Sequence, residues 1–145
     1  MDLKNLSLTG LAFTVIATVT LVFREAFFAR EPIGITIQVL AAMLMLWARL
    51  TFGRRSFHAN AIPTEGGLMT AGPYKFLRHP IYASLLYFIW AGVASHLSLL
   101  NVLLGSVPTV GLSIRMLAEE RLVIEKYPEY LTYASRTKRV IPFIL

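Results

Sequence analysis

Four long apolar stretches constrain this chain of 145 residues more than any other feature of its sequence. None of them contains a lysine, arginine, aspartate or glutamate. The stretches are residues 6–23, 33–48, 81–95 and 97–114. About 20 helical residues cross the hydrocarbon core of a bilayer, with about 17 as the lower limit, so we expect the third stretch to include flanking residues or to tilt little. The expected membrane-spanning helices cover about 6–23, 33–50, 80–95 and 97–115.

The composition agrees with a lipid environment. Apolar residues make up 56% of the chain and charged residues 15%, and the mean hydropathy is +0.62. A soluble domain has about 45–50% apolar and about 25% charged residues. Because Phe23-Arg24-Glu25-Ala26 is not a small-residue cleavage site, we expect the first stretch to be a retained helix rather than a signal peptide. The sequence predicts one all-α integral-membrane domain over residues 1–145, with a helical C-terminal segment outside the membrane.

The basic residues indicate how such a domain is oriented. With four spans, both termini and the polar segments 51–79 and 115–145 lie on one side of the membrane. That side carries 12 of the 14 lysines and arginines, and the other side has only Arg24 and Arg30. The positive-inside rule therefore places both termini and the two polar segments in the cytoplasm.

The charge and the rare residue types exclude several kinds of protein. The net charge is +6, but the basic residues lie between apolar stretches and form no continuous stripe, which favours a membrane surface over nucleic acid. The absence of cysteine excludes disulfides, thiolate nucleophiles and cysteine metal sites. The three histidines are too scattered to predict a metal site. The sequence does not indicate an oligomeric state.

The segment Arg78-His79-Pro80-Ile81-Tyr82 stands where the third helix is expected to begin. Proline suits the first helical turn, where its missing N–H costs nothing. His79 then lies at the start of the helix, with Tyr82 on nearly the same face. Two interpretations stay open: a binding site, or an arginine that anchors to phosphate beside a surface histidine and an interfacial tyrosine.

Arg115, Glu119 and Glu120 stand where the fourth helix leaves the membrane. Arg115 and Glu119 are spaced i, i+4 and can form a simple helix-end ion pair. Ionisable groups near hydrocarbon are costly, however, which favours a functional interpretation. The short connection after residue 95 predicts a tight hairpin of the third and fourth helices, so we expect these residues to lie close to His79 and Tyr82.

Two further segments lie on the cytoplasmic side. The glycine-rich run from Gly66 to Tyr74 permits close approach of a ligand, but it lacks the spacing of a dinucleotide fingerprint and, taken by itself, is more typical of a plain flexible loop. Tyr130 and Tyr133 are spaced as on one face of a helix, and Pro142 ends the regular part.

Taken in order, these motifs resemble one known family. The resemblance is carried by Gly72-Pro73-Tyr74, Arg78-His79-Pro80-x-Tyr82, Arg115 with Glu119-Glu120, Tyr130-x-x-Tyr133-x-x-Arg136 and Ile141-Pro142. From about Trp47 onward the chain is similar to the isoprenylcysteine carboxyl methyltransferase family and the related membrane phospholipid methyltransferases. The resemblance implies an α-helical membrane enzyme that holds S-adenosylmethionine at the cytoplasmic face and methylates a small or lipophilic acceptor.

The resemblance also implies roles for individual residues. Arg115 would orient the acceptor substrate, and either Glu119 or Glu120 would bind the cofactor. The other expected cofactor-binding residues are Gly66, Gly67, Leu68, Met69, Tyr74, His79, Pro80, Ile81 and Tyr82. No metal is implied. A carboxylate acceptor is already a nucleophile, so positioning and desolvation can supply most of the acceleration.

Three alternatives stay open. The acceptor can be an amine, as in a phospholipid-type N-methyltransferase. Sterol-reductase-type enzymes also contain an arginine-histidine-proline element and use NADPH, although they are generally much larger. The third is a non-enzymatic four-helix protein, such as a small cation exporter or an assembly factor. An exporter is expected to carry an acid within the membrane, and none of the four stretches contains one.

Overall fold

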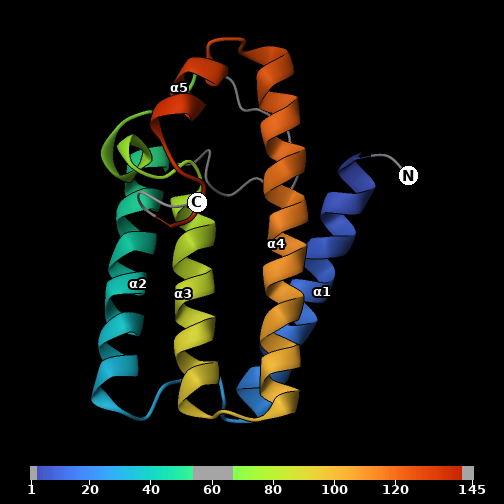
Figure 1. The fold of residues 1–145 in the computed structure, drawn as a ribbon, viewed down its shortest axis with the longest axis vertical. Helices are drawn as coiled ribbons and strands as arrows, with labels where there is room; N and C mark the ends of the chain where they lie inside the picture. The colour runs from blue at the N-terminus through green and yellow to red at the C-terminus, as the bar shows by residue number, and fades with distance from the viewer. Residues whose placement is uncertain (1–2, 54–66, 142–145) are drawn as a thin grey trace.

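Six helical segments make up the parts of the chain that the computed structural model describes, residues 3–53 and 67–141 (Figure 1). They are α1 (Leu3–Phe23), α2 (Pro32–Phe52), η2 (Gly72–Lys75), α3 (Pro80–Ser95), α4 (Leu99–Lys126) and α5 (Tyr130–Arg136). η2 is a single 3₁₀ turn, and no strand occurs in these described residues beyond one isolated β-bridge. The predicted all-helical fold is confirmed.

Each apolar stretch is helical as predicted. α3 has the predicted bounds, and α4 continues beyond the apolar stretch and carries Arg115, Glu119 and Glu120 in its second half. Within the described residues, α2 and α4 are long and apolar enough to cross a membrane. α3 and residues Leu8–Phe23 of α1 are shorter apolar helices. The four-span arrangement and its orientation remain predictions.

The four long helices pack as two pairs. α1 lies along α4, and α2 lies along α3 (Figure 1). In the first pair, a Cβ atom on Gly111 would come within 2.6 Å of the carbonyl oxygen of Gly10 and 2.7 Å of Thr14 Oγ1. Only glycine therefore permits the backbones of α1 and α4 to approach this closely. The expected tight hairpin of α3 and α4 is thus incomplete, because α3 packs mainly on α2 and α4 packs mainly on α1.

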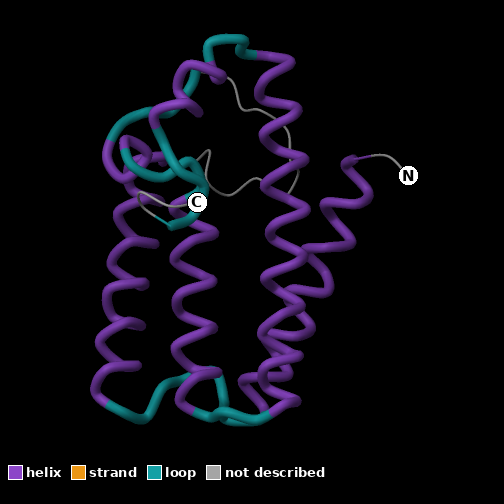
Figure 2. The backbone as a smooth tube through the Cα atoms, in the orientation of Figure 1, coloured by secondary structure: helices purple, strands orange, loops and turns teal. Residues whose placement is uncertain are grey.

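The loops gather at the two ends of the bundle (Figure 2). At the end formed by residues 24–31 and 96–101, which we call the opposite end, the side chain of Gln38 holds the loop between α1 and α2. Its amide oxygen accepts a hydrogen bond from the backbone N–H of Ala29 at 3.0 Å, and its amide nitrogen donates to the carbonyls of Phe27 at 2.7 Å and Phe88 at 3.0 Å. This buried glutamine joins α2, α3 and the loop.

At the other end, residues 137–141 run beside the loop that leads into α3, and we call them the strap. The strap and the loop pair in parallel through the bridge between Leu77 and Lys138. The N–H of Arg78 donates to the carbonyl of Lys138 at 2.7 Å, and the N–H of His79 donates to the carbonyl of Arg139 at 3.1 Å. The strap therefore fixes the backbone just before α3.

Candidate functional site

His79 and Pro80 form the entry to α3. Pro80 occupies the first turn of the helix, and His79 is its N-cap residue. Both are buried, and Ile81 beside them is half-buried. The interpretation of His79 as a surface residue is therefore wrong, because the strap and α4 cover it.

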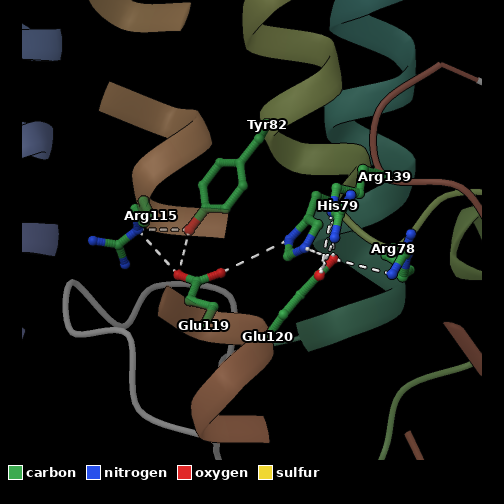
Figure 3. Close-up of polar contacts among 7 residues, drawn as sticks. All are labelled: Arg78, His79, Tyr82, Arg115, Glu119, Glu120 and Arg139. Carbon is green, nitrogen blue, oxygen red and sulfur yellow. Dashed lines mark hydrogen bonds and ion pairs between the residues drawn. The ribbon is translucent and has the colours of Figure 1, made fainter. Parts of the chain in front are cut away.

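Tyr82, Arg115 and Glu119 form a triangle of polar contacts between α3 and α4 (Figure 3). Arg115 Nε donates to the Tyr82 hydroxyl at 2.6 Å, and that hydroxyl donates to Glu119 Oε1 at 2.5 Å. Arg115 Nε also lies 3.0 Å from Glu119 Oε1. The predicted i, i+4 pair of Arg115 and Glu119 is present, and both residues also contact Tyr82 of α3.

Glu120 has different surroundings, although it is the next residue along α4. Its side chain is only 8% exposed and lies among three basic groups from outside α4. Arg78 Nη1 is 3.3 Å from Oε1, His79 Nε2 is 3.2 Å from Oε1, and Arg139 Nη2 is 2.9 Å from Oε2. Because consecutive helical residues point about 100° apart, the two adjacent carboxylates serve separate groups.

His79 connects the two groups. Its Nε2 contacts Glu120, and its Nδ1 lies 3.9 Å from Glu119 Oε2. The imidazole also stacks on the ring of Tyr82, with 5.6 Å between centroids and 18° between planes. Figure 3 shows the continuous chain of contacts from Arg115 through Glu119 and His79 to Glu120 and Arg139. The predicted convergence of His79, Tyr82, Arg115 and Glu119 is confirmed.

The charges around Glu120 set its ionisation. Burial alone would raise the pKa of Glu120, but hydrogen bonds from His79 and Arg139 and the nearby charge of Arg78 outweigh it and lower the pKa to about 2. Glu120 is therefore an anion at neutral pH. Burial, with a contribution from the Glu120 charge, raises the pKa of Tyr130, which stays a neutral hydroxyl.

Aromatic residues of the tail pack against η2. The hydroxyl of Tyr133 donates to the carbonyl of Tyr74 at 2.7 Å, and the Tyr74 ring lies 5.4 Å from that of Phe52. The rings of Tyr130 and Tyr133 are 5.6 Å apart in an edge-to-face arrangement, so the predicted helical face of the tail is present in α5. These contacts hold α5 and the strap over the entry to α3.

The glycine-rich run is less well joined to this cluster. Gly66 lies outside the described residues. Gly67 has φ +82°, with open space around its Cβ position, so a side chain there would be strained by the backbone alone. Among the described residues, no hydrogen bond or ion pair connects Leu68 or Met69 to the cluster, and no group of three or more metal-ligating side chains occurs.

Two basic members of the cluster, Arg78 and Arg139, are not among the site residues expected from the sequence. The interpretation of Arg78 as a phosphate anchor is wrong, because its guanidinium pairs with Glu120. Arg139 had been counted only as a cytoplasmic charge. The sequence signal that could have identified Arg139 is its place in a short extended segment after the last helix. The parallel pairing of this segment with residues 76–79 is a long-range contact that no local pattern encodes.

Comparisons with known proteins place the chain in a family. The model of the phospholipid methyltransferase family matches residues 29–130. Methanethiol S-methyltransferase 1 of Bradyrhizobium diazoefficiens is 35% identical over 74 residues, which are 48% of this chain and 24% of that protein. Protein-S-isoprenylcysteine O-methyltransferase B of Arabidopsis thaliana is 29% identical over 119 residues, which are 77% of this chain and 58% of that protein. These matches cover less than two thirds of either relative, and no solved structure matches.

Proposed function

The chain belongs to the phospholipid methyltransferase family, and from that premise we propose that it transfers a methyl group from S-adenosylmethionine to a small or lipophilic acceptor at the cytoplasmic membrane face. The predicted resemblance to this group of membrane methyltransferases is confirmed by the family match. The cofactor and the acceptor are proposals that rest on the chemistry of the cluster around His79.

Glu119 is the observation that carries the cofactor proposal. Its side chain is 22% exposed, and its Oε1 is engaged by Arg115 and Tyr82. Its Oε2 lies 3.9 Å from the nearest ring nitrogen of His79, beyond hydrogen-bond distance. This oxygen can accept a hydrogen bond from an amino or hydroxyl group of S-adenosylmethionine, whereas both oxygens of Glu120 are already bound. We therefore assign the cofactor contact to Glu119 and a supporting role to Glu120.

The rest of the proposed cofactor site surrounds Glu119. The stacked rings of His79 and Tyr82 give a flat aromatic and polar surface, and Pro80 and Ile81 fix its position at the start of α3. Tyr74 and the segment 66–69 complete the set that the family resemblance implies. S-adenosylmethionine supplies the electrophilic methyl group, and the protein residues bind it, orient it and exclude water.

Arg115 is the proposed acceptor-orienting residue. Its guanidinium is buried where α4 leaves the apolar stretch, and its Nε is held by Tyr82 and Glu119. A guanidinium binds a carboxylate through two parallel hydrogen bonds, so a lipophilic carboxylate fits this position. The attacking oxygen of such an acceptor carries no proton to remove, and no general base is required.

The cofactor proposal is tested by calorimetry on the detergent-purified protein. We expect binding of S-adenosylmethionine and of S-adenosylhomocysteine, and none of NADPH. Tight NADPH binding with no response to the sulfonium compound would overturn the proposal in favour of a reductase. Absence of binding for all three compounds would instead favour the non-enzymatic alternative.

The acceptor proposal is tested at Arg115. We expect Arg115→Ala and Arg115→Lys to retain cofactor binding but to lose most transfer to a lipophilic carboxylate, because lysine lacks the planar fork of arginine. If Arg115→Ala also abolishes cofactor binding, Arg115 serves only to hold Glu119 and the acceptor assignment fails. Full activity of Arg115→Lys would favour a phospholipid-type acceptor, which needs only a positive charge.

The proposed orientation has four spans with both termini in the cytoplasm. The chain contains no cysteine, so single cysteines report on sidedness without background. In intact cells, a membrane-impermeant maleimide should label Leu97→Cys at the opposite end and should not label Ser135→Cys in α5. Labelling of Ser135→Cys from outside would reverse the assigned orientation.

A further inference from the structure

The buried carboxylate of Glu120 gathers side chains from two segments that are far apart in the sequence. Arg78 and His79 come from the loop before α3, and Arg139 comes from the strap. The side chain of Glu120 is less exposed than that of Glu119, 8% against 22%. Its surroundings therefore indicate a part in arranging the site rather than direct contact with a ligand.

Arg139 makes the most extensive contact with Glu120. Its Nε lies 3.2 Å from each carboxylate oxygen, and its Nη2 lies 2.9 Å from Oε2. Such a forked contact fixes the plane of the carboxylate as well as its distance. The side chain of Arg139 is 38% exposed, so solvent weakens its purely electrostatic contribution to stability. The main effect of the pair between Arg139 and Glu120 is therefore to orient the carboxylate rather than to stabilise the fold.

Arg139 also reaches His79 through its backbone. Its carbonyl accepts the N–H of His79 at 3.1 Å, while its side chain orients the carboxylate that meets His79 Nε2. Because the ionised carboxylate of Glu120 has only acceptors, Nε2 must carry the proton in this contact. Nδ1 then faces Glu119 at 3.9 Å, on the proposed cofactor side. One strap residue therefore fixes both the main chain and the ring orientation of His79.

We propose that Arg139 is a positioning residue that acts through Glu120 to hold the His79 ring for cofactor binding. This inference rests on the proposed function, because it concerns the same site. The strap then does more than pack: without Arg139, only Arg78 and His79 hold the Glu120 carboxylate, both at Oε1, so its plane is no longer fixed and its contact with the Nε2 proton of His79 is weakened.

The test measures two properties of Arg139→Ala in detergent. Calorimetry with S-adenosylhomocysteine should show affinity lowered about 10-fold, the scale expected for loss of one hydrogen bond to a charged group. In ¹⁵N-histidine NMR spectra of the cofactor-free protein, the ring signal assigned to His79 through His79→Gln should shift. Lys138→Ala is the matched control, because it removes an equal charge from the adjacent exposed residue and should change neither property. If Arg139→Ala does not fold, Arg139→Lys serves in its place, with a smaller affinity loss of about 3-fold expected from its remaining charge.

The outcomes separate this inference from the proposed function. A wild-type protein that binds no S-adenosylhomocysteine overturns the proposed function, and with it the role of Arg139 in binding. Normal affinity in Arg139→Ala, or an unshifted His79 signal, overturns only the positioning role. Equal losses in Arg139→Ala and Lys138→Ala would assign the effect to the charge of the strap and would also overturn it.

Discussion

The two ends of the helix bundle are held together by different chemistry. At the site end, Arg78, Arg115 and Glu120 are largely removed from solvent, and they pair with one another or with neighbouring side chains. At the opposite end, the buried amides of Gln38 and Asn101 are neutral, and the ion pair between Arg30 and Glu25 is exposed to solvent. Both ends join a loop to the helices, yet only one buries charge.

This difference supports the function proposed for the site end. Withdrawing ions from water costs several kcal/mol for each ion, and their attraction repays this only when the geometry is good and the remaining hydrogen bonds are made. The opposite end closes its loop without that cost. A loop can therefore be joined to such a bundle without buried charges, and their presence at one end supports the binding role proposed for that end.

The largest expected effect follows from Glu120→Ala. This change leaves Arg78, His79 and Arg139 facing one another without their anion, and removal of one partner from a buried ion pair typically costs about 3–5 kcal/mol. We expect a loss of that size in unfolding free energy, measured by denaturant titration in detergent. Glu125→Ala, on the exposed side of the same helix, should cost less than about 0.5 kcal/mol. Equal losses of unfolding free energy in Glu120→Ala and Glu125→Ala would show that the buried ion pairs of Glu120 do not stabilise the fold.

A smaller and more selective effect is expected for His79→Ala and Glu119→Gln. Both remove a proposed contact with the cofactor, while glutamine keeps an acceptor for Tyr82 and Arg115. Loss of a hydrogen bond to a charged group costs about 1.5–3 kcal/mol, so the affinity for S-adenosylmethionine should fall about 10- to 150-fold. Calorimetry measures this loss, and circular dichroism checks that helix content is kept. Unchanged affinity in both variants would place the site elsewhere.

At the opposite end, Gln38→Leu should reduce stability without affecting binding. The change leaves the N–H of Ala29 and the carbonyl of Phe27 without their side-chain partner, which costs about 1–3 kcal/mol for a buried polar group. Denaturant titration should show this loss, while cofactor affinity stays within about 2-fold of the wild type. A large loss of affinity in Gln38→Leu would mean that the two ends are coupled, contrary to the separation described above.

The smallest effect is the pH dependence of the site end. The pKa of Glu120 is lowered from an ordinary value of 4.5 to about 2, so its contribution to stability is complete above about pH 5 and is lost as the pH falls toward 2. Lowering the pH from 7 to 4 should cost on the order of 1 kcal/mol from this group. Glu120→Gln should lack this part of the acid sensitivity, and Glu125→Gln should retain it. Parallel acid curves for all three proteins would contradict the assignment.

Much of the fold could be predicted because its signals are local. The apolar stretches, Pro80 at a helix start and the i, i+4 spacing of Arg115 and Glu119 each depend on nearby residues. The different contacts of Glu119 and Glu120 could not be predicted, because they depend on which side chains of α3, its preceding loop and the strap lie beside each carboxylate. Arg139 was missed for the same reason. The pairing of α1 with α4 rests on the close approach at Gly10 and Gly111, which a hydropathy pattern does not reveal.

The parallel bridge between Leu77 and Lys138 has a consequence for biosynthesis. The ribosome completes α1 to α4 before it adds the strap, and chains begin to fold from the N-terminal side as they are made. Helix insertion and pairing of the membrane segments therefore precede the closing of the His79 loop. The nascent protein can settle in the lipid before its cluster of charges is assembled, so the costly burial of ions comes last, on a scaffold that is already in place.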